Sequence, residues 1–359
     1  MNTLPDALPI VRERIAQQGR RASYHEHELT SPLDLCDRRG RLNPAAVGWS
    51  RAPLVRANLS HHWLRKKRWN FWNWIFPGGV LSATVADIDY AAFCEVTFTD
   101  FATRQSVSVL APARPGSIAL AEHVERTLEF RAKTIAYACV HEGDKLRVSL
   151  EAKGKASGVA VAAELVVVKP PGHETLNIVV PWTSQRFQLN SKHCALPTSG
   201  TIRVGSREYV LRPEEAHAVQ DFGRGVWPYR SFWNWAVATG VEDGTSIGVN
   251  MGGKWTTGTG VNENALCIDG RLHKVMEDLE WRYDPSDWLR PWRVVAPGSR
   301  MIDLTLEPVV ARTPRVSLGF VRSGGVCCFG RWRGTVRYDG NERPIRSLLG
   351  WAEEFDHRW

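Results

Sequence analysis

The residues most suited to chemistry lie in two polar stretches of the second half of the chain. The first, residues 217–230, combines His217 and Asp221 with two arginines, a tryptophan and a tyrosine among glycines. The second, residues 257–265, places Glu263 between two asparagines just before an apolar strand. A carboxyl buried against aromatic rings has a raised pKa and can donate a proton near neutral pH. We therefore predict Asp221 and Glu263 as the acid–base pair, with His217 as a third catalytic residue.

Polar and aromatic side chains around these acids are predicted to bind the substrate. Loops at the rim of a rigid β-scaffold are where functional sites commonly lie. A structural role is the alternative: Asp221 could pair with an arginine in a tight turn, and Glu263 could neutralise Arg224 or Arg230. The predicted substrate-binding residues are Arg224, Trp227, Tyr229, Arg230, Trp233, Asn234, Asn264 and His273.

A tetrapeptide that occurs twice indicates how these residues are positioned. Phe-Trp-Asn-Trp stands at residues 71–74 and again at 232–235, and an alternating strand-like run follows each copy. Repeats of this kind are the mark of a duplicated unit. Strand alternation places the two tryptophans of each copy on one face, with Phe and Asn on the other. The tryptophans are predicted to fill a core or to line a cavity.

Short alternating runs separated by turns recur along the whole chain, which favours an all-β fold. Asp269-Gly270 between two such runs is a strong hairpin signal. Helical signals are confined to short stretches at residues 8–18 and 117–127. We predict two tandem lipocalin-like antiparallel β-barrels, formed by internal duplication, with few short helices. The predicted domains are an extended arm (1–60), a first barrel (61–212) and a second barrel with a docked C-terminus (213–359).

Composition argues against several classes of function. The net charge of +8 comes from residues spread over the chain, whereas nucleic-acid-binding proteins gather basic residues in one patch, so we expect no nucleic-acid partner. No apolar run reaches 18 residues and residues 1–21 lack an apolar core, so we expect no integral membrane segment and a cytoplasmic location. Neither a phosphate-binding glycine loop nor metal-ligand spacing occurs; His25 and His27 alternate without a third partner. We expect no cofactor and no metal.

Several blocks of the sequence resemble a bacterial family, number 2804 among the domains of unknown function. These blocks are residues 40–51, 67–72, 221–229 and 260–265. More distantly, the tandem barrels and the many tryptophans are similar to the two-barrel superfamily of carotenoid hydratases, tocopherol cyclases, AttH and fungal Diels–Alderase-type cyclases. That resemblance implies an apolar ligand and a buried acid, and no catalytic residue of those enzymes is placed on this sequence.

The function favoured by these features is binding of an apolar, isoprenoid- or lipid-like small molecule in a tryptophan-lined cavity. A cofactor-independent hydratase, cyclase or isomerase would act there by acid–base chemistry. One alternative is a non-catalytic lipid carrier of the same architecture. The other is a carbohydrate-active enzyme that uses Asp221 and Glu263, because tryptophan stacks on sugars and paired carboxyls hydrolyse glycosides.

Overall fold

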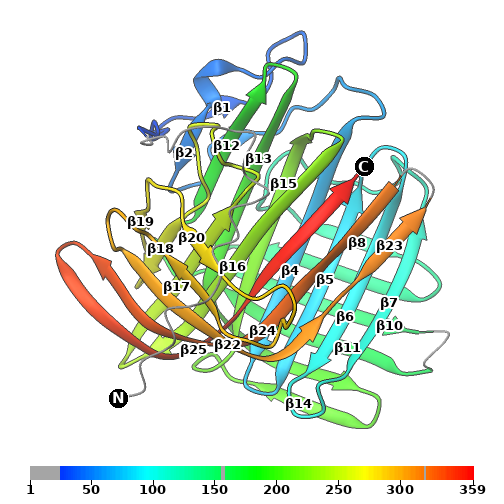
Figure 1. Ribbon diagram of the computed structural model, residues 1–359. Helices are drawn as coiled ribbons and strands as arrows, with labels where there is room; N and C mark the ends of the chain where they lie inside the picture. Colours follow the sequence, from blue (N-terminus) through cyan, green and yellow to red (C-terminus); the bar gives the residue numbers. More distant parts are fainter. Residues whose placement is uncertain (1–24, 155–157, 319–320) are drawn as a thin grey trace.

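The computed structural model describes residues 25–154, 158–318 and 321–359, and they are almost entirely β-structure (Figure 1). Within these residues the one helical element is a 3-10 turn, η1 (Pro44–Ala46). The prediction of an all-β fold is therefore confirmed. Residues 117–127 form no helix, because Ile118 is buried in the first barrel core and Val124 in a separate cluster beneath the arm, which keeps the chain extended. Residues 8–18 lie outside the described residues.

The first sheet runs in the order β7-β6-β5-β4-β15-β13-β11-β10-β9-β8, and β2, β12 and β14 attach beside this path. Its strands are β2 (Gly48–Ser50), β4 (Lys66–Phe76), β5 (Gly79–Asp87), β6 (Ala92–Asp100), β7 (Ser106–Ala113), β8 (Leu128–Arg131), β9 (Ile135–Glu142), β10 (Lys145–Lys153), β11 (Ala160–Val168), β12 (Leu176–Thr183), β13 (Arg186–Val204), β14 (Arg207–Leu211) and β15 (His217–Val226).

The second sheet runs in the order β19-β18-β17-β16-β25-β24-β22-β21-β20, and β23 pairs with β24. Its strands are β16 (Arg230–Glu242), β17 (Thr245–Gly253), β18 (Ala265–Ile268), β19 (Arg271–Lys274), β20 (Glu280–Arg282), β21 (Trp292–Val295), β22 (Ile302–Arg312), β23 (Arg315–Leu318), β24 (Val321–Tyr338) and β25 (Asn341–Arg358). Asp269 and Gly270 both have positive φ and join β18 to β19, which confirms the predicted hairpin.

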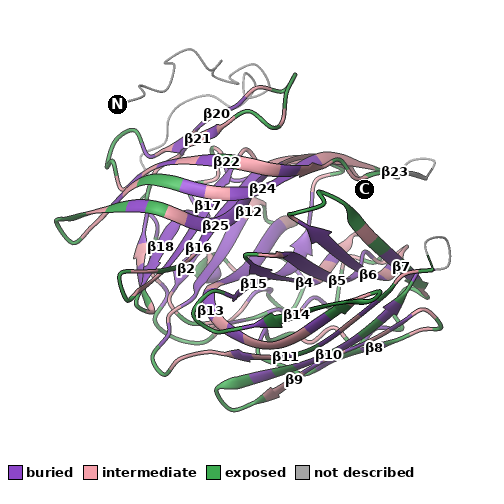
Figure 2. Cartoon of the chain, turned by 90° about the horizontal axis from the view of Figure 1, so that it is seen from below, coloured by how far each residue is buried: buried purple, intermediate pink, exposed green. Residues whose placement is uncertain are grey.

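The two sheets follow one plan, as expected for a duplicated unit. A four-strand meander (β4 to β7, and β16 to β19) lies beside a long central strand (β15 or β25) in each. The two Phe-Trp-Asn-Trp copies fall on β4 and β16, which hold the same place in the two sheets. Each sheet curls around its own hydrophobic core, so the architecture is that of two lipocalin-like barrels. In Figure 2, buried residues concentrate where the two sheets meet, and the hairpin ends are exposed.

The two tetrapeptides point in opposite directions relative to their barrels. Trp72 and Trp74 on β4 are buried in the core of the first barrel. On β16, Trp233 and Trp235 instead face the first sheet, while Ala236 lies in the second barrel core. Because side chains alternate between the two faces of a strand, an offset of one residue turns every side chain to the opposite face of the sheet. The same tetrapeptide therefore contributes its tryptophans to a barrel interior in the first copy and to the surface between the barrels in the second.

The change of sheet falls between Val226 and Arg230, beyond the predicted junction at residues 212 and 213. The polar turn there only joins β14 to β15, and β15 returns into the first sheet between β4 and β13. Upstream, residues 25–60 carry β1 (Leu33–Asp34) and β3 (Val55–Arg56), which pair with each other, and β2, which pairs with β12. Part of the predicted arm is thus built into the first sheet.

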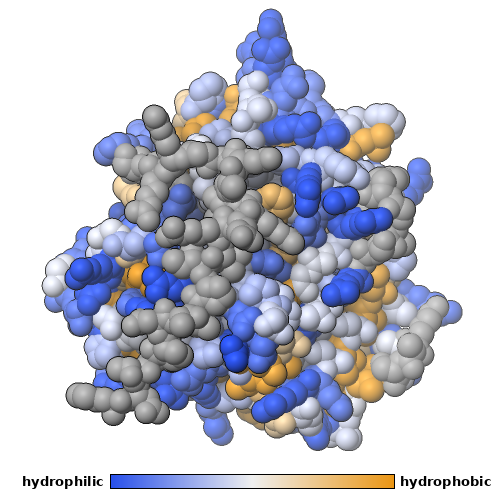
Figure 3. Space-filling view, in the orientation of Figure 1, coloured by the Kyte–Doolittle hydropathy of each residue, from blue (hydrophilic) through white to orange (hydrophobic). Residues whose placement is uncertain are grey.

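The face of the molecule in Figure 3 is largely hydrophilic, and its apolar side chains form separate small patches. No helix of the described ranges has the length and apolarity needed to cross a membrane.

Candidate functional site

The surface between the two sheets, which we call the seam, brings together four buried charged side chains: Lys192, Asp221, Glu263 and Glu353. Two hydrophobic clusters there draw residues from both sheets, and β13 contacts β16 and β17. On the first sheet, alternation sends Asn190, Lys192 and Cys194 of β13 toward the seam. Asp221 of β15 is the direct cross-strand partner of Lys192 and shares this face.

Lys192 is the centre of this charge. Its Nζ lies 2.9 Å from Oδ2 of Asp221 and 3.2 Å from Oε2 of Glu263, which comes from the second half of the chain. The Nζ also stands 3.8 Å from the centre of the Trp235 ring. Burial opposes the charge of Lys192, but the two carboxylates outweigh it and raise the pKa of the ammonium. Asn190 Nδ2 donates a 2.6 Å hydrogen bond to the other oxygen of Asp221.

Glu353 on β25 adds a third carboxyl to this group. Burial raises its pKa to about 7, against the opposing effects of the hydrogen bond from Trp233 and the charge of Lys192. Trp233 Nε1 donates to Glu353 Oε1 over 2.8 Å. One ammonium cannot neutralise three carboxylates in a region of low dielectric, so a carboxyl of the group retains a proton near neutrality. We call Lys192, Asp221, Glu263 and Glu353 the seam acid cluster.

Glu263 reaches the seam acid cluster because neighbouring residues make room for it and hold it. Its side chain is 1% exposed, and burial raises its pKa while Lys192 and Trp255 oppose that rise. Trp255 Nε1 donates a hydrogen bond to Glu263 Oε1. A Cβ at position 252 would overlap Glu263 Cγ, so only glycine fits on β17 at this point.

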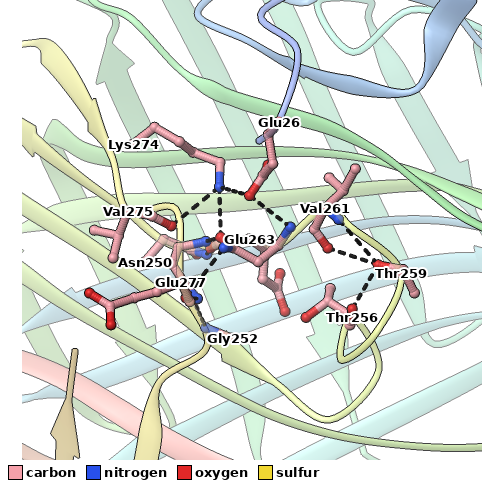
Figure 4. Close-up of polar contacts among 12 residues, drawn as sticks. Glu26, Asn250, Gly252, Thr256, Thr259, Val261, Glu263, Lys274, Val275 and Glu277 are labelled. Carbon is pink, nitrogen blue, oxygen red and sulfur yellow. Dashed lines mark hydrogen bonds and ion pairs between the residues drawn. The ribbon is translucent and has the colours of Figure 1, made fainter. Parts of the chain in front are cut away.

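The loop that carries Glu263 is fixed from behind by a buried ion pair (Figure 4). Lys274 Nζ donates to Oε1 of Glu26 over 2.7 Å and to Oδ1 of Asn262 over 2.6 Å. The backbone N–H of Asn262 donates to the same Glu26 oxygen. Asn264 closes the loop by accepting from Gly252 N–H and donating to the carbonyl of Glu277. The N-terminal arm thereby takes part in positioning the acid.

Six tryptophans cover one side of the seam acid cluster. Trp227 is their centre, with ring centroids 4.9 Å from Trp182, 5.2 Å from Trp255 and 6.1 Å from Trp233. Several of the outer rings are partly exposed to solvent, so the cluster extends from the acids toward the surface. The seam tryptophan cluster consists of Trp69, Trp182, Trp227, Trp233, Trp255 and Trp359.

Some predicted site residues meet at the seam. Asp221 and Glu263, far apart in sequence, both contact the ammonium of Lys192. Trp227 and Trp233 belong to the tryptophan cluster, and Trp233 contacts an acid directly. Asn264 holds the loop that carries Glu263 through hydrogen bonds with Gly252 and Glu277.

His217 and Arg224 of β15 lie outside the acid cluster. His217 shares the face of Asp221, but four residues of extended strand place it about 13 Å away. Burial lowers its pKa to about 4, so it is neutral at physiological pH. Arg224 points to the opposite face, where it donates to the carbonyl oxygens of Trp69 and Ala121 and to Oδ1 of Asn70. Its role there is to join strands.

The side chains of the remaining predicted residues take other positions. Asn234 faces the second barrel interior and donates to the carbonyl oxygen of Glu353. Tyr229 is 47% exposed, and the exposed Arg230 lies 3.5 Å from Asp356. His273 lies 3.4 Å from Asp339 in the β19 region.

Sequence reasoning missed Lys192 and Glu353. Lys192 stands in a strand that also carries Gln188, Asn190, Ser191 and His193, and Glu353 is followed by Glu354 and Asp356. Polar neighbours in the sequence therefore conceal both charges. Only the strand pairing shows that the two charges are buried and need partners on other strands. No group of three or more histidine, cysteine or acidic side chains in the described chain is placed to hold a metal ion.

Comparisons with known proteins place the chain in a family. Similar solved structures include kievitone hydratase from Nectria haematococca, with 10% identity, a TM-score of 0.46, and coverage of 82% of this chain and 89% of that one. An AttH-type protein from Nitrosomonas europaea has 14% identity, a TM-score of 0.44, and coverage of 81% and 92%. CghA has 9% identity, a TM-score of 0.40, and coverage of 84% and 90%. Similarity of this degree carries no information on ligand or reaction.

No curated protein sequence matches this chain. A family model does match, over residues 26–359, and its description is a domain of unknown function. Because this match spans nearly the whole chain, the protein belongs to the DUF2804 family.

Proposed function

We propose that the protein is an acid–base enzyme, a hydratase, cyclase or isomerase, that acts on a small apolar molecule at the seam. The observation that supports this proposal is the pairing of a carboxyl whose pKa is about 7, Glu353, with the ion-paired acids Asp221 and Glu263. An acid with a pKa close to the working pH is the most effective general acid. The tryptophan cluster beside it offers apolar surface for a ligand.

In this proposal each group has a distinct task. Glu353 donates a proton to a double bond or to a leaving oxygen of the substrate. Asp221, with 12% of its side chain accessible against 1% for Glu263, receives a proton from water or from the substrate. Lys192 stabilises the negative charge that develops, and Trp233 and Trp255 orient the carboxyls that they bind.

The arrangement disfavours a glycosidase. Oxygens of Asp221 and Glu263 bind the same ammonium nitrogen, whereas glycosidases hold two carboxyls free on either side of a sugar bond. Glu263 is also nearly inaccessible to solvent.

The test is isotope incorporation. The purified protein is incubated with a lipid extract, and separately with geraniol and farnesol, in water enriched in deuterium and oxygen-18, and products are read by mass spectrometry. We expect incorporation by the wild type and a loss of at least about 100-fold in Glu353→Gln. Glu95→Gln is the matched control, because Glu95 is another carboxyl whose pKa burial raises, and it lies on β6 outside the seam acid cluster.

Two results would contradict the proposal. Retention of a ligand from the extract without any incorporation would identify a carrier. Equal incorporation by Glu353→Gln and the wild type would show that the acid is not the proton donor.

A further inference from the structure

Two cysteines face each other across the seam. Cys194 lies on β13 of the first sheet, and Cys267 lies on β18 of the second. Both belong to the same hydrophobic cluster of the seam. All seven cysteines are free thiols, six of them buried, and Cys194 alone is partly exposed. Cys194 is thus the more accessible residue of this pair.

The backbone brings the two side chains within bridging range. Cys267 is the direct cross-strand partner of Gly248, and a Cβ added to Gly248 would lie 3.2 Å from the Cβ of Cys194. Directly opposed Cβ atoms in an antiparallel pair are about 5 Å apart. Cys194 thus stands where the missing side chain of residue 248 would be, next to Cys267. A disulfide joins Cβ atoms that are about 4 Å apart, so a small approach of β13 and β18, together with rotation of the two side chains, would bring the sulfurs into bonding distance.

The surroundings activate one of the two sulfurs. The thiols form a hydrogen bond with each other, which lowers the pKa of Cys267 to about 6 and raises that of Cys194. His173 Nε2 lies 3.8 Å from Cys267 Sγ and 3.0 Å from the carbonyl oxygen of Cys194. A thiolate beside a thiol and an imidazole is the setting in which cysteine reacts with oxidants.

We propose that Cys194 and Cys267 are a redox pair that a hydroperoxide oxidises to a disulfide between the two sheets. The Cys267 thiolate takes the proton of Cys194 as the Cys194 sulfur attacks the outer oxygen of the peroxide, and the O–O bond breaks. Cys194 becomes a sulfenic acid, and the hydroxide or alkoxide that leaves takes up a proton from solvent. The Cys267 sulfur then attacks the sulfenic sulfur, the S–S bond forms, and the proton of Cys267 leaves with the sulfenic hydroxyl as water. The two sulfurs lose two electrons, and the peroxide gains them.

The disulfide would tie β13 to β18 close to the seam acid cluster. Lys192 is two residues from Cys194 and on the same face of β13. Oxidation therefore fixes the strand that presents the central ammonium. This inference does not depend on the proposed function, because cross-linking of the sheets is measured without any substrate.

The test is peptide mapping after oxidation. The native protein is treated with hydrogen peroxide, free thiols are blocked with iodoacetamide under denaturing conditions, and unreduced tryptic peptides are analysed by mass spectrometry. We expect a cross-linked pair of peptides containing Cys194 and Cys267, lighter by two hydrogens and separated by dithiothreitol. Oxidation should raise Tm by several degrees in the wild type and in Cys36→Ser, and not in Cys194→Ser.

Peptide mapping of the wild type alone tests the proposed disulfide, even if a variant fails to fold. Sulfinic acid on Cys194 without a cross-link would overturn the proposal, since it would show that Cys267 does not resolve the sulfenic acid. A cross-link that joins other cysteines, or an equal rise in Tm in Cys194→Ser, would overturn it as well.

Discussion

The ammonium of Lys192 lies 3.8 Å from the centre of the Trp235 ring, although the two residues belong to different sheets. A cation over an indole face is stabilised by the ring quadrupole, and more so when both are shielded from water. The same nitrogen binds Asp221 of its own sheet and Glu263 of the other half of the chain. One buried charge thus joins the two sheets through an aromatic contact and two ion pairs.

Removing this charge is expected to destabilise the protein strongly. Lys192→Met keeps most of the length of the side chain but leaves Asp221 and Glu263 buried without their counter-ion, so we expect a loss of about 3–5 kcal/mol in the free energy of unfolding at pH 7. The loss should shrink as the pH falls and the carboxyls take up protons. Urea unfolding at several pH values measures this, and the exposed Lys145→Met is the control. A loss that is the same at every pH would contradict the role given to Lys192.

Glu353→Gln should alter how stability depends on pH. The folded state holds the proton of Glu353 up to a pH of about 7, whereas the unfolded chain releases it near 4.5. Between these values the folded state binds more protons, so the wild type loses stability as the pH rises, by on the order of 3 kcal/mol in all. The variant lacks this group and should show a flatter profile. Parallel profiles for the two proteins would contradict the raised pKa.

The buried His217 should make the protein less stable as the pH falls. Burial lowers its pKa from 6.5 to about 4, so between these values the unfolded chain binds a proton that the folded protein does not. The wild type should therefore lose about 3 kcal/mol as the pH falls from 6.5 to 4. His217→Leu removes this loss. At equal stability at pH 8, the variant should therefore unfold at a lower pH than the wild type. The exposed His25→Ala should leave the wild-type midpoint unchanged.

The two tetrapeptide copies offer a matched pair of substitutions. Trp233→Phe deletes the hydrogen bond to Glu353, which should raise the pKa of that carboxyl further, by about one unit. Trp74→Phe, at a fully buried site in the first barrel, removes packing without contacting the acid cluster. The infrared band of protonated carboxyls, followed against pH, separates the two. Equal titration midpoints in both variants would contradict the link between Trp233 and Glu353.

The sequence was sufficient to predict the fold class, and local patterns explain why. Alternating apolar residues, the Asp269-Gly270 turn and the repeated tetrapeptide are each read from neighbouring positions. Asp221 and Glu263 were selected as candidates because they stand in unusual polar stretches, and the structure places both beside Lys192. Lys192 and Glu353 were missed because other polar and charged residues surround each of them in its strand, and only strand pairing across the whole chain shows that they are buried together. His217 and Arg224 were chosen for their nearness in sequence to Asp221. In the structure, His217 lies four residues along β15 from Asp221, which is too far for contact, and Arg224 points to the opposite face of the sheet.

The division of the seam acid cluster between two sheets has a consequence for biosynthesis. Lys192 and Asp221 leave the ribosome before Glu263, and Glu353 follows on β25, a central strand of the second sheet. Until then the face of the first barrel that carries Lys192 lacks two of its carboxyls and the ring of Trp235. The seam therefore acquires its full set of counter-charges only when β25, which is synthesised last, pairs with β16.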